Sequence, residues 1–285
     1  DPRVVAGDAI PQESALALRG RSSGAYTRVQ PAAAVPDAEE VSELAELART
    51  YTRGVIACGP LDLDTGAVDA LVQLGVATGW PILAEPTAQL RSGAHTNRGA
   101  LLAHADLLLR DAAFAAAQAP DVVLRVGPMP TSKAFRQWIE GHPPEHLVVV
   151  DPGSKWEDPS HRASWMLRAD PALLAERVAR QLGSSLAARS EARWIGAWRT
   201  AEDAARSVLA EELSNATGLA VAALMQALAA ALPDDALLYV ASSMAVRDVD
   251  LYWPLGTRRL RVLCNRGANG IDGLVSSALG AAAAH

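Results

Sequence analysis

Residues 37–182 alternate between short apolar runs and longer segments whose apolar positions follow a helical period. The apolar runs with the length of buried strands are Val55–Cys58, Ile82–Ala84, Val122–Val126, Leu147–Val150 and Trp165–Arg168. The helical segments are Ala38–Thr50, Thr65–Thr78, Leu101–Asp106, Arg110–Gln118, Thr131–Glu140 and Pro171–Gln181. Short apolar strands that alternate with helices are typical of a parallel sheet covered on both faces. We therefore predict an α/β fold with a Rossmann-like central domain over residues 37–182.

A second α/β pattern follows a long predicted helix, Ala192–Ser214, in which Trp194 and Trp198 lie one turn apart and are interpreted as domain-interface anchors. Its elements are a helix at Leu219–Leu232 and strands at Leu237–Val240 and Arg261–Cys264. Two strands cannot bury a sheet, so we expect this second domain to be incomplete. The predicted organisation is an arm over 1–36, the central domain over 37–182, a link with the long helix over 183–215, and the incomplete domain over 216–285.

Composition and charge exclude several classes of function. The net charge of -6 disfavours a nucleic-acid partner, because phosphate binding requires clustered positive charge. The sequence shows no secretory signal and no apolar run of about 18 residues, so we expect a cytoplasmic protein without a membrane span. Cys58 and Cys264 each end an apolar run and are predicted to be buried, reduced thiols. The histidines show no metal-ligand spacing.

The strongest candidate site is a glycine-rich loop between a strand and a helix. Asn265–Gly273 reads Asn-Arg-Gly-Ala-Asn-Gly-Ile-Asp-Gly, and a helix-like run begins at Leu274. Glycines let the main chain approach a ligand, and a helix N-terminus offers unpaired N–H groups. Ser242–Arg247 follows the preceding strand, and ligands of α/β sheets bind beyond the carboxyl ends of the strands. By spacing alone, a tight turn between strand and helix explains the loop equally well.

Each candidate residue also has a plain structural interpretation. Ser243 stands where a cap of the next helix is expected, and Arg247 can pair with a neighbouring aspartate on the surface. In these plain interpretations, Arg266 is a solvated loop residue, Ile271 fills the core and Lys133 lies on a solvated helix face.

The residues of the loop carry a more specific signal than their spacing. Asn265–Gly273, followed by Ser276 and Ser277, resembles a loop of the 2-succinyl-5-enolpyruvyl-6-hydroxy-3-cyclohexene-1-carboxylate synthases (SEPHCHC synthases), which are thiamine diphosphate-dependent enzymes of menaquinone biosynthesis. Other segments resemble parts of these enzymes in the same order: Arg53–Gly59, Gly79–Glu85, Gly127–Trp138, Asp151 with Asp158–His161, and Ser242–Arg247. The resemblance therefore covers the chain from about residue 50 to its last residue.

The resemblance implies decarboxylation of 2-oxoglutarate and addition of the remaining succinyl unit to isochorismate, with thiamine diphosphate and Mg²⁺ (or Mn²⁺) as cofactors. The residues implied to bind substrates are Lys133, Ser243, Arg247 and Arg266. The residues implied to bind the cofactor are Ser242, Ser243, Gly270 and Ile271, with Ile271 beneath the thiamine. The resemblance further implies a homodimer or homotetramer.

The family also uses groups that are not found in this sequence. Its activating glutamate belongs to a preceding domain and its metal-binding turn to a following segment, so no catalytic residue and no metal ligand is assigned here. We therefore expect the 285-residue chain to be inactive by itself. Two alternatives stay open: another thiamine diphosphate enzyme, such as an acetolactate synthase or a 2-oxo acid decarboxylase, and a non-catalytic α/β module that binds a small anion.

Overall fold

A computed structural model describes residues 27, 29–30, 32–153, 155–183, 193–215, 220–265 and 271–285. Most of the predicted arm over 1–36 lies outside these residues. The chain divides into two units, and the elements of secondary structure described here belong to the second, Ala34–His285.

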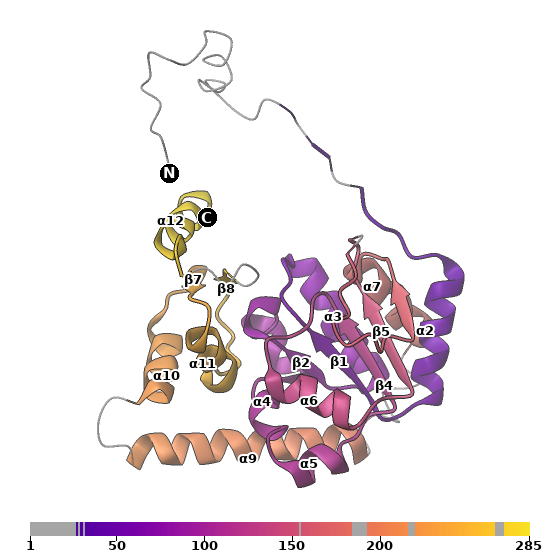
Figure 1. Ribbon diagram of the computed structural model, residues 1–285, viewed down its shortest axis with the longest axis horizontal. Coiled ribbons are helices and arrows are strands. Elements are labelled where there is room, and N and C mark those ends of the chain that lie inside the picture. The colour runs from indigo at the N-terminus through magenta and orange to yellow at the C-terminus, as the bar shows by residue number, and fades with distance from the viewer. Residues whose placement is uncertain are drawn as a thin grey trace. The chain divides into compact units, whose positions relative to one another are not determined.

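Six parallel strands form the central sheet in the order β3-β2-β1-β4-β5-β6 (Figure 1). Their bounds are β1 Gly54–Cys58, β2 Ile82–Ala84, β3 Leu101–Leu102, β4 Val122–Val126, β5 His146–Val150 and β6 Trp165–Leu167. The strand order reverses between β1 and β4, which is the doubly wound arrangement. The predicted α/β fold with a Rossmann-like central domain is therefore confirmed.

Successive residues of each strand face opposite layers of helices. In β1, Ile56 and Cys58 belong to one apolar cluster, whereas Val55 and Ala57 belong to another. The first cluster contains side chains of α2 (Ala38–Thr50), α3 (Thr65–Thr78) and α7 (Pro171–Leu182). The second contains side chains of α4 (Ala105–Leu108), α5 (Ala112–Ala117), α6 (Lys133–Gly141) and α9 (Arg193–Asn215). Helices thus cover both faces of the sheet, as strands with buried apolar residues require.

The first helices begin and end at capping signals that the sequence contains. The Asp37 side chain accepts a hydrogen bond from the Glu40 N–H, and the Glu40 carboxylate accepts one from the Asp37 N–H, which makes a capping box. The Asp64 side chain accepts a hydrogen bond from Ala67 N–H at 2.8 Å. Gly79 ends α3 in the left-handed conformation, with φ 71°. The predicted bounds of α2 and α3 are confirmed.

The prediction of a helix at Leu101–Asp106 was wrong. Leu101–Leu102 is a short strand that pairs with β2, and the helix begins only at Ala105. A strand of this length is recognised by its pairing partner, which local periodicity does not reveal. The predicted helix Arg110–Gln118 is shorter than expected and spans Ala112–Ala117.

The tryptophans of α9 anchor this long helix on the central sheet. Trp198 is fully buried, and its ring meets those of Phe114 and Trp138 edge-on, at centroid distances of 5.0 and 5.7 Å. The indole N–H of Trp194 donates a hydrogen bond to the Gly54 carbonyl at 2.8 Å. The two tryptophans therefore anchor α9 on the central sheet, whereas their place at a domain interface stays a prediction.

A smaller parallel sheet lies in the C-terminal part of the chain (Figure 1). Its elements are α10 Val221–Ala231, β7 Ala236–Val240, α11 Met244–Tyr252, β8 Leu260–Cys264 and α12 Leu274–Ala284. A compact apolar cluster around Val246, Val249 and Trp253 holds α11 against the two strands. No residue of α10 or α12 is buried. The elements match the second predicted α/β pattern, while the domain boundaries stay a prediction.

Cys58 and Cys264 are not joined by a disulfide, and their thiols lie in different surroundings. Cys58 is buried at the end of β1, and burial raises the pKa of its thiol to about 12. Cys264 ends β8 and is only half-buried, so the expected burial is wrong for this residue.

Candidate functional site

The carboxyl ends of β7 and β8 bring Ser242 next to the start of the glycine-rich loop. The Ser242 hydroxyl donates a hydrogen bond to the Asn265 carbonyl at 2.7 Å, and the Tyr239 hydroxyl bonds to the Asn265 side chain. The Asn265 amide in turn lies 3.4 Å from the Ser277 hydroxyl at the start of α12. Ser242 and Asn265, which belong to the two segments that the sequence singled out, therefore lie in contact at one edge of the small sheet.

Ser243 is the residue before α11, but it does not act as a plain cap. Its side chain is exposed and makes no capping hydrogen bond. Its φ of 70° with ψ of -126° lies in a region that residues with a Cβ avoid, at a cost of about 1–3 kcal/mol. Strained backbone of this kind concentrates at ligand sites. In this conformation the Ser243 hydroxyl accepts no hydrogen bond from the first N–H groups of α11.

Arg247 lies one helical turn after Ser243 and is exposed. Its guanidinium is 3.8 Å from the Met244 sulfur, and no ion pair joins it to Asp248, Asp250 or any other residue that the structure describes. Asp250 is instead buried and paired with Arg91. The interpretation that Arg247 pairs with a neighbouring aspartate is therefore wrong.

The other predicted site residues lie on two further segments. Ile271 is 88% exposed, so it does not plug the core. Lys133 is exposed and begins α6, directly after Ser132, whose hydroxyl accepts the Phe135 N–H at 2.9 Å. Arg266 and Gly270 lie outside the residues that the structure describes.

The usual ligand crevice of a doubly wound sheet is closed in the central domain. The N–H of Gly59, after β1, donates to the Val126 carbonyl at the end of β4. A Cβ on Gly59 would lie 1.8 Å from the Pro128 carbonyl oxygen, so the two loops are in direct contact. A cleft of about 420 Å³ lies beside them, between the loops that hold Leu61 and Met129 and the end of β8. At this edge of the central sheet, the open space therefore lies between the loops after β1 and β4 and the end of β8.

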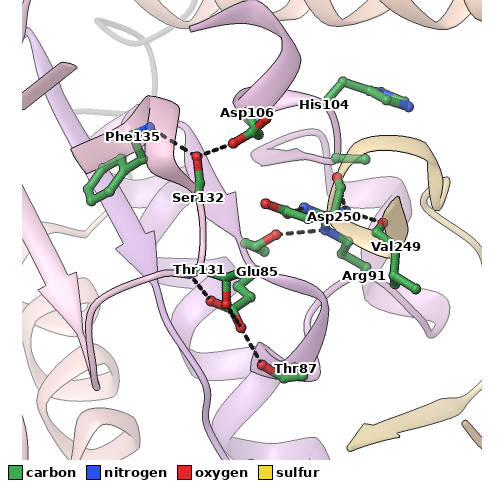
Figure 2. A network of polar contacts seen from close by, with 12 residues as sticks. Glu85, Thr87, Arg91, His104, Asp106, Thr131, Ser132, Phe135, Val249 and Asp250 are labelled. Carbon is green, nitrogen blue, oxygen red and sulfur yellow. Dashed lines mark hydrogen bonds and ion pairs between the residues drawn. The ribbon is translucent and has the colours of Figure 1, made fainter. Parts of the chain in front are cut away.

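A buried polar network joins the central sheet to α11 (Figure 2). Arg91 and Asp250 form an ion pair at 2.5 Å, and both side chains are almost fully buried. Ser132 donates a hydrogen bond to the Asp106 carboxylate, which also binds Arg110 at 2.8 Å. A cavity of about 20 Å³, the size of a single water site, lies among Asp106, Ser132 and Asp250.

The electrostatics of this network are dominated by burial. Burial raises the pKa of the Asp250 carboxyl to about 7, although the guanidinium of Arg91 opposes the shift. The carboxylates of Glu85 and Asp106 raise this pKa further, because they add negative charge nearby. Burial thus favours the neutral form of the Asp250 carboxyl, whereas its ion pair with Arg91 favours the charged form.

The sequence pattern singled out none of Glu85, Gln89, Arg91 and Asp250 as functional residues. Polar residues that follow a buried strand directly, as Glu85 follows β2, are the signal that could have identified this segment. Arg91 and Asp250 are 159 positions apart, and local pattern gives no sign of their contact.

Residues 21–240, more than half of the chain, match the family described as "Middle domain of thiamine pyrophosphate". The chain belongs to this thiamine pyrophosphate enzyme family. It is 42% identical to the SEPHCHC synthase of Myxococcus xanthus, over 95% of this chain and 45% of the relative. It is 40% identical to the synthase of Geobacillus thermodenitrificans, over 87% of this chain and 41% of the relative. The resemblance to SEPHCHC synthases is confirmed, and the chain spans less than half the length of these relatives.

A solved structure supports the fold. It is the X-ray structure of a Mycobacterium smegmatis protein described as a candidate thiamin diphosphate-dependent enzyme. The TM-score is 0.54 at 16% identity, and the match covers 91% of this chain and 47% of that one. At this identity the likeness concerns the fold.

The residues at the edge of the small sheet fit a thiamine diphosphate ligand in two respects. The N-terminus of α11 is not capped by Ser243 and can receive an anionic group. Ile271 presents an apolar side chain that is not needed by the core, as a stacking partner of an aromatic ring would.

The part of the chain that the structure describes contains no group of three or more His, Cys, Asp and Glu placed to hold a metal ion. In the same described part, no helix combines the length and the apolar character needed to cross a membrane.

Proposed function

We propose that this chain is part of a thiamine diphosphate-dependent SEPHCHC synthase, which decarboxylates 2-oxoglutarate and joins the remaining succinyl unit to isochorismate. The observation that carries the proposal is the 42% identity to the Myxococcus xanthus synthase over 95% of this chain. The meeting of Ser242 with the glycine-rich loop at one strand edge supports it, because that edge is where α/β folds bind ligands.

Residues of α11 bind the anionic groups in this proposal. Ser243 and the first N–H groups of α11 hold a diphosphate or carboxylate, and Arg247 holds a carboxylate of 2-oxoglutarate through its planar fork. Since Arg247 has no ion-pair partner among the described residues, its charge is available to a substrate. Arg266 is proposed to contact the dicarboxylates as well.

The remaining assignments concern the ring of the cofactor and the second substrate. Ile271 supports the thiamine from below, Gly270 offers its carbonyl to the aminopyrimidine, and Lys133 binds isochorismate from the central domain. When bound, thiamine diphosphate supplies an electron sink that lets a 2-oxo acid lose carbon dioxide and retain a nucleophilic carbon. We further propose Mg²⁺ (or Mn²⁺) as the companion of the diphosphate and a homodimer or homotetramer as the assembly.

The proposal explains why an acidic chain presents cations at this site. Both substrates are polyanions, while the chain carries a net charge of -6. Without local positive charge, the protein's field would repel them. Lys133 and Arg247 are both exposed and therefore able to supply that charge.

The test is an assay of the native polypeptide that contains this sequence, with thiamine diphosphate and Mg²⁺. We expect turnover with 2-oxoglutarate and isochorismate, and little with pyruvate as the donor. Preference for pyruvate would favour an acetolactate synthase or a decarboxylase instead.

The role of Arg247 has a separate test in the same assay. Arg247→Ala should raise the KM for 2-oxoglutarate about 10–100-fold, since a charge-assisted hydrogen bond contributes about 1.5–3 kcal/mol. The control is Arg206→Ala, which removes another exposed arginine, from α9. An unchanged KM in Arg247→Ala would remove Arg247 from the site.

A further inference from the structure

One short segment, Glu85–Ser92, contacts elements that carry or lead to several of the proposed binding residues. It follows β2 directly and contains the short helix η2, Pro86–Ala88. The side chains of Arg91 and Glu85 reach α11 and the loop before Lys133 (Figure 2). The side chain of Gln89 reaches β8. Segments that hold several functional elements at once determine how these elements are placed relative to one another.

Arg91 binds the carboxyl end of α11 through hydrogen bonds and an ion pair. Its guanidinium donates to the Asp250 carbonyl at 2.9 Å and to the Val249 carbonyl at 3.4 Å, and forms the ion pair with the Asp250 carboxylate. Its Nε donates to the Ala84 carbonyl at the end of β2, at 2.6 Å. A cation at the carboxyl end of a helix is favourable, because the free carbonyls there are partly negative. Arg91 thus ties the helix that carries Arg247 to the central sheet.

Gln89 forms hydrogen bonds with β8 through both the nitrogen and the oxygen of its side-chain amide. Its Nε2 donates to the Val262 carbonyl at 2.8 Å, and its Oε1 accepts from the Val262 N–H at 3.1 Å. The backbone of Gln89 is left-handed, with φ 61°, which is uncommon for a residue other than glycine. The strain indicates that the surrounding structure imposes this conformation. Gln89 thus ties the strand that leads into the glycine-rich loop to the same segment.

Glu85 accepts two hydrogen bonds from the loop before Lys133. Its buried carboxylate accepts the N–H of Thr131 at 2.5 Å and the hydroxyl of Thr131 at 2.9 Å. The Thr87 hydroxyl donates to the same carboxylate at 2.7 Å. Lys133 begins α6 only two residues after Thr131. The backbone of the segment adds a further tie, since the Gly256 N–H, between α11 and β8, donates to the Arg91 carbonyl at 3.0 Å.

We propose that Gln89 and Arg91 are positioning residues that hold β8 and the helix that carries Arg247 in register with Lys133, so that the two substrates meet in a reactive arrangement. This inference rests on the proposed synthase function. Neither residue is proposed to touch a substrate. Their effect is on the relative placement of two binding elements, and displacements of about 1 Å can lower a rate about 100-fold.

The kinetic test compares Arg91→Lys and Gln89→Ala with wild type in the native polypeptide. Both variants should lower kcat of the complete reaction about 10–100-fold. The KM for each substrate should change less than about threefold, because Arg247 and Lys133 keep their charges. Carbon dioxide release from 2-oxoglutarate with ferricyanide as the oxidant needs no isochorismate, and should fall much less than the complete reaction.

The matched control is Arg53→Lys, at the opposite edge of the central sheet. Arg53 donates to the Ala117 and Ala119 carbonyls, and its guanidinium lies 4.9 Å from the ring centre of Trp194. This variant removes a comparable fork of hydrogen bonds and should keep kcat within about twofold. An equal loss of kcat in Arg53→Lys, or a loss confined to KM, would overturn the positioning role.

A second measurement separates this inference from the function on which it rests. Hydrogen exchange of the 285-residue chain should be faster in α11 for Arg91→Lys and in β8 for Gln89→Ala, with β1 and β4 unchanged. Unchanged exchange, or an equal increase in β1 and β4, would refute the inference even if the native polypeptide is a synthase. Localised faster exchange without any turnover of 2-oxoglutarate by wild type would support the contacts of Arg91 and Gln89 but overturn their role in this reaction.

Discussion

The central sheet and the C-terminal sheet are both parallel, but they bury their residues to very different degrees. Every residue of β1 and β4 is buried, whereas Val240 is the only buried residue of β7. Helices on both faces shield the central sheet, while α10 and α12 contain no buried residue. The central sheet therefore has a core of its own. The small sheet has the compact cluster around Val246, Val249 and Trp253, and the side chains of Gln89 and Arg91 reach β8 and α11 from the central domain.

The largest expected effect concerns the core of the central domain. Trp198→Ala should lower the free energy of unfolding by about 3–5 kcal/mol, because it leaves a large cavity between α9, α5 and α6. Urea denaturation followed by circular dichroism measures this. Trp156→Ala, at a site 63% exposed, is the control and should change stability by about 0.5 kcal/mol or less. Similar losses in both variants would contradict a core centred on Trp198.

The second effect tests the junction between the two sheets through its pH dependence. The pKa of Asp250 is raised from 3.8 to about 7 in the folded chain, so the folded state binds the extra proton between these values. The stability from this proton is complete below the unfolded pKa and is lost as pH rises through about 7. From this group alone, the free energy of unfolding should fall by about 2–3 kcal/mol between pH 5 and pH 8.

Asp250→Asn should remove that dependence, since asparagine does not titrate in this range. The measurement is urea denaturation of both proteins at pH 5 and pH 8, with the difference between the two compared at each pH. Variant and wild type that lose stability in parallel would show that Asp250 titrates well below neutral pH.

The third effect tests how tightly the loops at the carboxyl edge of the central sheet are packed. Gly59→Ala would place a methyl group 1.8 Å from the Pro128 carbonyl oxygen, and neither backbone can move without disturbing β1 or β4. Overpacking of this kind should cost about 1–3 kcal/mol in unfolding free energy. A thermal melt that matches wild type would mean that the two loops separate easily.

The smallest effect is expected in the C-terminal helix. An added Cβ at Gly280, in α12, meets no atom within 4 Å. Gly280→Ala should therefore stabilise α12 by up to about 1 kcal/mol, because alanine favours a helix more than glycine does. Slower amide exchange within α12, with the central sheet unchanged, is the expected result. A loss of helicity would show that another group occupies this space.

Local signals sufficed for most of the fold. Asp64 and Gly79 mark both ends of α3, and the apolar run of β4, interrupted only by Arg125, is typical of a buried strand between helices. Leu101–Leu102 was misassigned because its strand character comes from pairing with β2, not from its own residues.

Part of the candidate site could also be predicted from local signals, whereas the part that depends on tertiary contacts could not. Ser242, Ser243 and Arg247 follow a strand in sequence, so they could be identified from the chain alone. Gln89 contacts a residue 173 positions away, and nothing in its sequence neighbours marks that contact. The groups proposed to bind ligands follow from local pattern, whereas those proposed to position them arise only from tertiary structure.

The amide of Gln89 has one further consequence, for solubility. β8 pairs with β7 along one side, and its opposite side would present an unpaired N–H and carbonyl at Val262. Gln89 satisfies both groups with a single side chain, as the peptide group of a neighbouring strand would. An exposed strand edge recruits other chains into aggregates, and this side chain removes the attachment point at the middle of the strand.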